Sequence, residues 1–261
     1  MTSAIPADVN RAGTAEPRAL GFRIPAAVLA LVMALTGGKL LVFAWVDPSD
    51  HGIHRMQDLH WGVAEGLLLA VPLALSAWRP VQRVAMMRVV FLALAAQVLI
   101  GVATLTPDPF AIVLVVLGAA LVMAHPARHT LLRPRFHRPG ATLRAAAVST
   151  LLLGAAFAAV QVAHHFQAAA GDPLRIKTGW IGAALCSLGI SAVAAAGLWL
   201  RDHTALAFAA ASVLVLGAGS LVHSSAPSSL GLVGGATAVV VASTLLVYLS
   251  AGGSRADGSI H

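Results

Sequence analysis

The segment HGIHRMQDLHWGVAEG, residues 51–66, places three histidines, two carboxylates and an arginine at the edge of an apolar run. Neutral imidazole and carboxylate are ligands for zinc, copper and iron, and histidine is the usual axial ligand of haem. In a helix, His54 and Asp58 share one face, because residues i and i+4 are neighbours there. His60 and Glu65 follow inside the apolar run. These residue types and spacings indicate the rim and upper wall of a polar cavity.

Three further histidines stand at the ends of later apolar runs and extend the same hypothesis. The full candidate set for an outer site that binds a metal ion (copper or zinc) or haem is His51, His54, His60, His164, His165 and His223. The alternative is that these amphipathic side chains lie at the headgroup level as ordinary helix-end residues. No spacing matches a specific metal motif such as HExxH, so both interpretations stay open.

The composition decides the class of protein. Of 261 residues, 58% are hydrophobic and 10% are charged, which indicates an integral membrane protein. A span needs about 20 apolar residues to cross a hydrocarbon core of ~30 Å. The sequence therefore predicts an all-α membrane protein of about eight transmembrane helices, at 25–46, 59–78, 84–105, 109–124, 143–165, 179–200, 204–222 and 230–250.

The positions of the arginines predict the orientation. They concentrate in the N-terminal tail 1–24, in the loops after the second and fourth spans, and in the C-terminal tail 251–261. With eight spans these segments share one side, so the positive-inside rule makes both termini cytoplasmic. The arginine-rich, lysine-poor composition is typical of GC-rich bacteria, and we expect a multi-pass protein of the bacterial inner membrane. No basic stripe interleaved with aromatics indicates nucleic-acid binding, so the expected partner is the lipid bilayer.

Two four-helix halves are a further possibility. A shift of about 119 residues lays residues 59–80 over 178–202, with partly coinciding aromatic and glycine positions. The predicted repeats are 25–124 and 143–250, within one transmembrane domain, 25–250. Chance matches in apolar sequence are the alternative.

Polar residues inside the spans are candidates for function, because such groups are costly in lipid. Lys39 and Glu65 both lie roughly 10 Å below the outer ends of their spans, counted at 1.5 Å per residue. We expect these two residues to form a buried pair, with Gln97 and Gln161 as supporting polar groups. An ion pair that only fixes the helix register is the structural alternative.

The stretches HRMQDLHWGVAEG and AHPARHTLLRP carry the family resemblances. HWGVAEG and AHPARHTLLRP make the chain similar to uncharacterised polytopic membrane proteins of GC-rich bacteria. With eight spans and outer histidines, the chain also resembles haem A synthase, through His60, and CopD-type copper-resistance membrane proteins. These resemblances imply haem or copper as ligands. The haem A synthase pattern is incomplete here, because the sixth span has Gly179 near the corresponding position and the eighth span has no histidine.

Three functions follow as hypotheses from these patterns. The first is a membrane protein with an outward-facing polar site that binds a metal ion or haem. The second is a small-solute or ion transporter that uses Lys39 and Glu65 as its coupling pair. The third is a structural membrane subunit. The sequence contains no Ser-His-Asp set and no G-x-S-x-G elbow, so an unassisted hydrolase is not expected.

Overall fold

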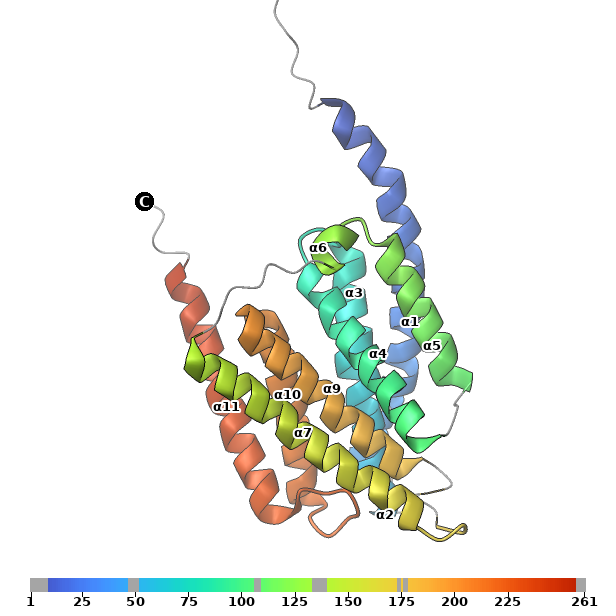
Figure 1. The fold of residues 1–261 in the computed structure, drawn as a ribbon, viewed down its shortest axis with the longest axis vertical. Coiled ribbons are helices and arrows are strands. Elements are labelled where there is room, and N and C mark those ends of the chain that lie inside the picture. Colours follow the sequence, from blue (N-terminus) through green and yellow to red (C-terminus); the bar gives the residue numbers. More distant parts are fainter. Residues whose placement is uncertain are drawn as a thin grey trace, which may run out of the picture.

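The computed structural model describes residues 9–46, 52–105, 109–132, 140–172, 175 and 178–256. Throughout these ranges the regular elements are helices (Figure 1). The all-α class expected from the sequence is confirmed. The elements are α1 (Val9–Val46), α2 (Gly52–Gly62), the π-helix η1 (Val63–Ala70), α3 (Val71–Trp78), α4 (Val84–Thr104), α5 (Pro109–Ala124), α6 (Arg128–Leu132), α7 (Ala141–Gln167), α9 (Gly179–Leu200), α10 (His203–Val222) and α11 (Gly231–Ala256).

Seven helical stretches within the described residues are long and apolar enough to cross a bilayer. They are Leu20–Val46, His54–Trp78, Val84–Thr104, Ala141–Gln167, Gly179–Leu200, His203–Val222 and Gly231–Ala251. The fourth predicted span corresponds to α5, whose apolar part Ile112–Ala124 is shorter. Its 16 residues give α5 a length of about 24 Å, below the ~30 Å of a hydrocarbon core. The chain is a multi-pass helical membrane protein.

The helices extend further at both ends of the chain than the predicted tails allow. α1 begins at Val9, inside the tail predicted for residues 1–24, and α11 continues to Ala256. Residues 9–19 contain three alanines, two arginines and one glutamate, which favour helix, and α1 continues through them despite Gly13 and Pro17. The first span is thus the C-terminal part of a longer helix.

The second span changes its winding half-way. α2 passes into η1 and then into α3 without a break in the helix. The amide of Val71 donates to the carbonyl of Gly66, five residues back, as a π-helix requires. A π-segment inside a longer helix is frequently found at functional sites. In this protein it contains Glu65.

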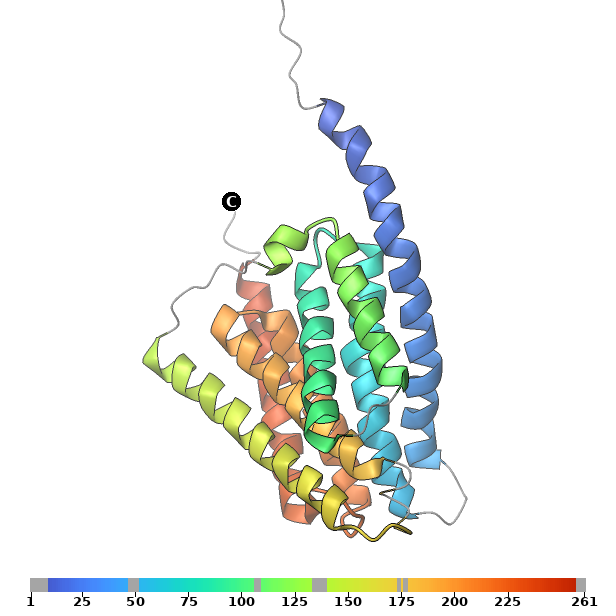
Figure 2. The ribbon, with the colours of Figure 1, turned by 45° about the vertical axis from the view of Figure 1, so that its right-hand side comes forward.

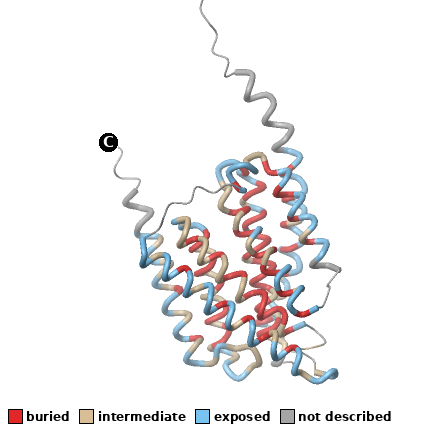
Figure 3. The backbone as a smooth tube through the Cα atoms, in the orientation of Figure 1, coloured by how far each residue is buried: buried red, intermediate tan, exposed pale blue. Residues whose placement is uncertain are grey.

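α9 is the central helix of the bundle. It packs against α7 on one side and against α4 and η1 on the other, while α10 lies beside α9 and α11 beside α10. Figures 1 and 2 show α7 strongly inclined across the outside of this group. Figure 3 places the buried residues along α3, α4 and α9, whereas α7 and α11 are largely exposed. These exposed faces are apolar, as lipid-facing surfaces are.

The same order of neighbours occurs in both halves of the chain. α1 packs on η1 and α4 on α5 in the first half, as α7 packs on α9 and α10 on α11 in the second. In this comparison α4 corresponds to α10, and η1 corresponds to α9. Between the halves, α4 contacts α9 and, in the same way, α10 contacts η1. The start of α1 and the end of α11 also lie toward the same end of the bundle (Figure 1). This arrangement agrees with an even number of crossings.

Candidate functional site

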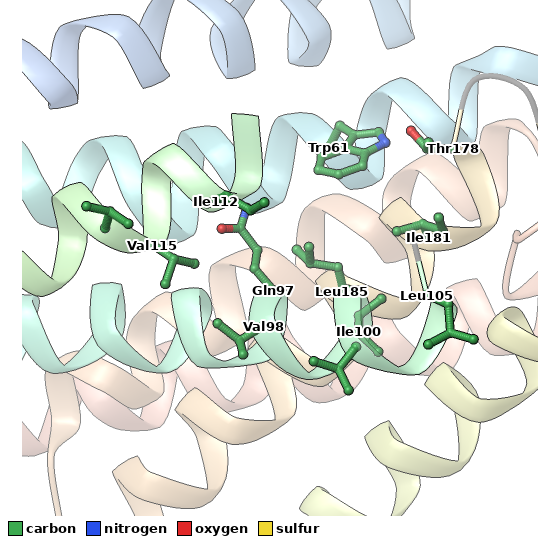
Figure 4. A pocket seen from close by; sticks show the side chains of 13 residues that line it. Trp61, Gln97, Val98, Ile100, Leu105, Ile112, Val115, Thr178, Ile181 and Leu185 are labelled. Carbon is green, nitrogen blue, oxygen red and sulfur yellow. The ribbon is translucent and has the colours of Figure 1, made fainter. Parts of the chain in front are cut away.

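A cavity of about 750 Å³ lies between α2, α4, α5 and α9. Its walls are almost entirely apolar, and the polar groups that line it are those of Trp61, Gln97 and Thr178 (Figure 4). A pocket of this size and lining is typical of a site for a small, mostly apolar ligand. The full lining is Trp61, Gln97, Val98, Ile100, Gly101, Val102, Leu105, Ile112, Val115, Val116, Thr178, Ile181 and Leu185.

Several cavity residues are exposed at the outer surface of the bundle, which fixes the direction of access. Val102 of α4 and Val116 of α5 are 69% and 60% exposed. Because α4 is a candidate membrane span and the apolar helix α5 packs beside it, this opening faces the lipid. A ligand can therefore reach the cavity sideways from the bilayer.

Of the three polar residues that line this apolar space, Gln97 is the one whose side-chain amide oxygen is buried without a partner among the described residues. Its side chain is 5% exposed, and its Oε1 makes no hydrogen bond with any described residue. Figure 4 shows the amide reaching from α4 across the cavity toward Ile112 of α5. A buried amide oxygen without a hydrogen-bond donor costs about 1–3 kcal/mol. A ligand that places one hydroxyl or N–H donor beside Oε1 would remove that cost.

Two residues at the rim of the cavity adopt a backbone conformation that is rare for their type. Leu105, which ends α4, has φ 51°, and Thr178, which precedes α9, has φ 57°. The left-handed region costs an ordinary residue roughly 1–2 kcal/mol, and strained positions cluster at ligand sites. The strained backbone at Leu105 and Thr178 makes the rim of the cavity a candidate part of a ligand site.

The wall formed by α2 is held in place by a close contact with α9. A Cβ added to Gly182 would lie 2.5 Å from Nε1 of Trp61. Only glycine lets the indole lie flat against α9 at this point. Trp61 is thereby fixed as a wall between the central helix and the cavity.

The structure separates the outer histidines into different helix pairs. His223 lies beside α1, with Nε2 3.2 Å from the carbonyl oxygen of Ala44, whereas the ring of His164 packs edge-on against Trp180 of α9. His54 hydrogen-bonds Gln57 over 3.1 Å within its own helix. His165, the other residue of the α7 pair, is buried and stacks edge-on with Phe166.

His60 is also buried, and its Nδ1 lies 2.6 Å from the carbonyl oxygen of Met56 one turn back. Among the described residues, no three histidine, cysteine, aspartate or glutamate side chains lie close enough to hold one metal ion. His51 lies outside the described residues. None of these histidines lines the cavity.

Lys39 and Glu65 are not brought together. Glu65 is buried, at 7% exposed, in η1. Lys39 is exposed on α1, and its Nζ lies 5.1 Å from the ring centroid of Phe43, one turn closer to the C-terminal end of the helix. A long side chain that runs toward the interface in this way is snorkelling. The residue that faces Glu65 from α1 is Gly37.

Gln161, the remaining predicted polar residue, is buried on α7, which packs against α9. Its Oε1 has no hydrogen-bond partner among the described residues. Gln161 does not line the cavity that holds Gln97. The predicted polar residues therefore occupy several places in the bundle instead of one cluster.

A buried histidine at the opposite end of the bundle was not among the predicted site residues. Nδ1 of His125 accepts the amide of Ala127 over 3.1 Å, and its ring packs edge-on against Phe22 at 4.7 Å. Burial lowers the pKa of His125, and the backbone carbonyl of Pro80 partly offsets this effect. A neutral imidazole thus joins α1, the loop before α4 and the start of α6.

No family model, curated protein or solved structure matches the chain.

The cavity was not predicted from the sequence, although Gln97 was singled out. The signal that could have located it is the combination of a buried glutamine, a short fourth span and a glycine, Gly101, one turn from Gln97. Gly101 leaves open space on the face of α4 beside Gln97, and α5 forms a facing wall of the cavity with Ile112, Val115 and Val116.

Proposed function

We propose that this protein binds one uncharged amphipathic molecule, taken from the bilayer, in the cavity between α2, α4, α5 and α9. The apolar part of the ligand would lie against the walls, and its single polar group would hydrogen-bond the amide of Gln97. The buried, unpartnered Oε1 of Gln97 in a cavity of about 750 Å³ carries the proposal. By the arginine distribution, this site lies in the outer half of a bacterial inner membrane.

Trp61 provides a direct way to detect such a ligand. In a variant whose other tryptophans (Trp45, Trp78, Trp180 and Trp199) are changed to phenylalanine, the fluorescence reports on the cavity wall alone. The probe is a monoacylglycerol with a brominated chain, which quenches a tryptophan on contact. We expect quenching that saturates as the probe is added in detergent.

Two further substitutions in this background make the test specific. Gly101 lines the cavity and a Cβ there meets nothing within 4 Å, so Gly101→Phe should fill the space and abolish the saturable quenching. Gly38, a span glycine outside the cavity with equally open space, supplies the matched control, Gly38→Phe. Gln97→Leu should weaken binding about fivefold to tenfold, the worth of one hydrogen bond. Quenching that rises linearly and equally in all variants would overturn the proposal.

A second candidate, an ion or solute transporter, is favoured by one observation. Glu65 is a buried carboxylate on a π-segment at the contact between α1 and η1. Such a group can exchange a proton during transport without a lysine partner. Proteoliposomes that contain a pH-sensitive dye would test this. A proton flux that Glu65→Gln removes and Lys39→Met leaves intact would support the transporter, and the absence of flux would reject it.

A further inference from the structure

A second hollow lies between α1 and α3, in the opposite half of the bundle. It measures about 730 Å³ and is lined by apolar residues apart from Arg23 at one end. The space exists because many of the facing residues of both helices are alanines. Their methyl side chains are too small to fill the gap between the two backbones. On α1 these are Ala27, Ala30 and Ala34, and on α3 they are Ala74 and Ala77, with Ala70 at the end of η1.

The length of this groove matches one leaflet. From Arg23 to Ala34 the helix rises about 16 Å, and half of a ~30 Å hydrocarbon core is about 15 Å. Ile24 and Leu31 on its edge are 63% and 60% exposed, so the groove opens to the lipid. An extended acyl chain fits this shape.

The end of the groove carries an unusual charge arrangement. The guanidinium carbons of Arg79 and Arg83 lie 4.6 Å and 5.8 Å from the ring centroid of Trp78, which itself lines the groove and is 60% exposed. Neither guanidinium forms a hydrogen bond or an ion pair with a described residue. Two cations around one ring repel each other, and an anion beside them would remove that cost.

A smaller hollow of about 270 Å³ adjoins these arginines. It is lined by Arg79, Gln82, Arg83, Ala85, Met86 and Thr204. The neighbouring carboxylate, Asp202, is engaged in capping α10, where its Oδ1 accepts the amides of Thr204 and Ala205 over 3.1 Å and 3.2 Å. The arginine donors therefore face a polar recess beside the end of an apolar groove.

We propose that this groove is a binding site for an anionic phospholipid of the arginine-rich leaflet. One acyl chain lies between α1 and α3, Trp78 sits at the headgroup boundary, and Arg79 and Arg83 hold the phosphate. Guanidinium groups bind phosphate oxygens in a bidentate manner, and basic pockets between helices on the cytoplasmic side recognise lipid headgroups. The site is separate from the cavity that contains Gln97.

Native mass spectrometry of the delipidated protein tests this assignment. Dioleoylphosphatidylglycerol is compared with dioleoylphosphatidylcholine and with inorganic phosphate as probes. We expect the anionic lipid to bind about thirtyfold more tightly than the zwitterionic lipid, since each of the two arginines near an anionic headgroup contributes about 1 kcal/mol. Equal binding of the two lipids would overturn the proposal.

Matched variants identify the two parts of the site. Arg79→Gln with Arg83→Gln should remove the preference for the anionic lipid, whereas Arg128→Gln with Arg144→Gln, two arginines outside the groove, should keep it. Ala74→Phe, which fills the exposed groove, should weaken binding of both lipids. Displacement by inorganic phosphate at a concentration similar to that of the lipid, or full binding in Ala74→Phe, would show that the groove holds no acyl chain and would also overturn the proposal.

Discussion

Gly37 of α1 and Gly66 of η1 pack backbone against backbone. A Cβ added to Gly37 would lie 2.5 Å from the amide nitrogen of Gly66 and 2.8 Å from Cβ of Glu65. Gly62, one turn before Gly66, meets Leu41 in the same manner at 2.8 Å. Close approach through small residues is the usual packing device between helices in lipid. This contact sets which face of α1 turns toward the bundle.

The first prediction concerns this contact. Gly37→Ala should destabilise the protein by about 1–3 kcal/mol, because the added methyl group meets backbone atoms that cannot move aside. Gly38→Ala is the control, since a Cβ there meets nothing within 4 Å. That variant should be neutral or more stable by up to about 1 kcal/mol, the gain in helix propensity. Thermal unfolding in one detergent compares them, and equal midpoints would contradict the packing.

The face of α1 explains why the sequence argument failed for Lys39. The depth of a residue along a helix follows from counting residues. The predicted pairing of Lys39 with Glu65 depends on this depth alone. The direction around the helix depends on which residues pack, and Gly37 occupies the inward face. Two residues further along, the helix has turned by about 200°, so Lys39 points outward. Sequence periodicity alone does not identify which small residues make the contact.

Other features were predictable to different degrees. The spans follow from runs of apolar residues, a local property that needs no knowledge of the partners, and all eight predicted ranges correspond to helices. The π-segment has no such local signal in the sequence; in the structure it packs against α1, α4, α9 and α10. The cavity depends on how α2, α4, α5 and α9 pack around one another, which no local stretch of sequence determines. The sequence predicts one side of the membrane for all the candidate histidines. Which residues each histidine contacts depends on tertiary packing, which the sequence pattern does not give.

The second prediction is that the effects of Lys39→Met and Glu65→Gln add. The side chain of Lys39 lies over Phe43 and makes no ion pair with a described residue, so it shares no partner with Glu65. Unconnected residues show coupling below about 0.5 kcal/mol. A double-mutant cycle of detergent stability measures this term. A coupling of 2 kcal/mol or more, on the order expected for a buried ion pair, would restore the pair predicted from the sequence.

The third prediction concerns Gln161. Its Oε1 is buried without a hydrogen-bond partner among the described residues. Gln161→Met removes this polar group at similar volume and should leave the stability unchanged or raise it by up to about 2 kcal/mol. The unfolding midpoint in detergent reports the change. A clear loss of stability would mean that the amide has a bound partner in the membrane.

The fourth prediction is topological. Cysteines introduced at Gly52, at the start of α2, and at Gly140, before α7, should be labelled from opposite sides of the membrane. The natural cysteine, Cys186, is fully buried, and Cys186→Ala provides a clean background. Membrane-impermeant maleimide applied to intact cells and to inverted vesicles separates the two sides. Labelling of both positions from one side would contradict the arrangement of the spans.

The fifth prediction is a pH dependence that arises from His125. Burial favours the neutral imidazole and lowers its pKa from the ordinary 6.5. Nδ1, as the acceptor of the Ala127 amide, cannot take up a proton without losing that hydrogen bond. Arg88 donates to Thr130 and Arg128 to Met123 in the same region, so the surrounding charges are also positive. The folded protein therefore resists protonation of His125.

The sign of the effect follows from proton binding. Below pH 6.5 the unfolded chain takes up a proton on His125 that the folded protein does not. The stabilising contribution is complete above that pH, and it is lost progressively as the pH falls from there toward the lowered pKa of the folded state. His125→Asn keeps an oxygen where Nδ1 stands but cannot be protonated. Between about pH 8 and about pH 5, the unfolding midpoint of the variant should fall less than that of the natural protein, and identical pH profiles would exclude His125 as the responsible group.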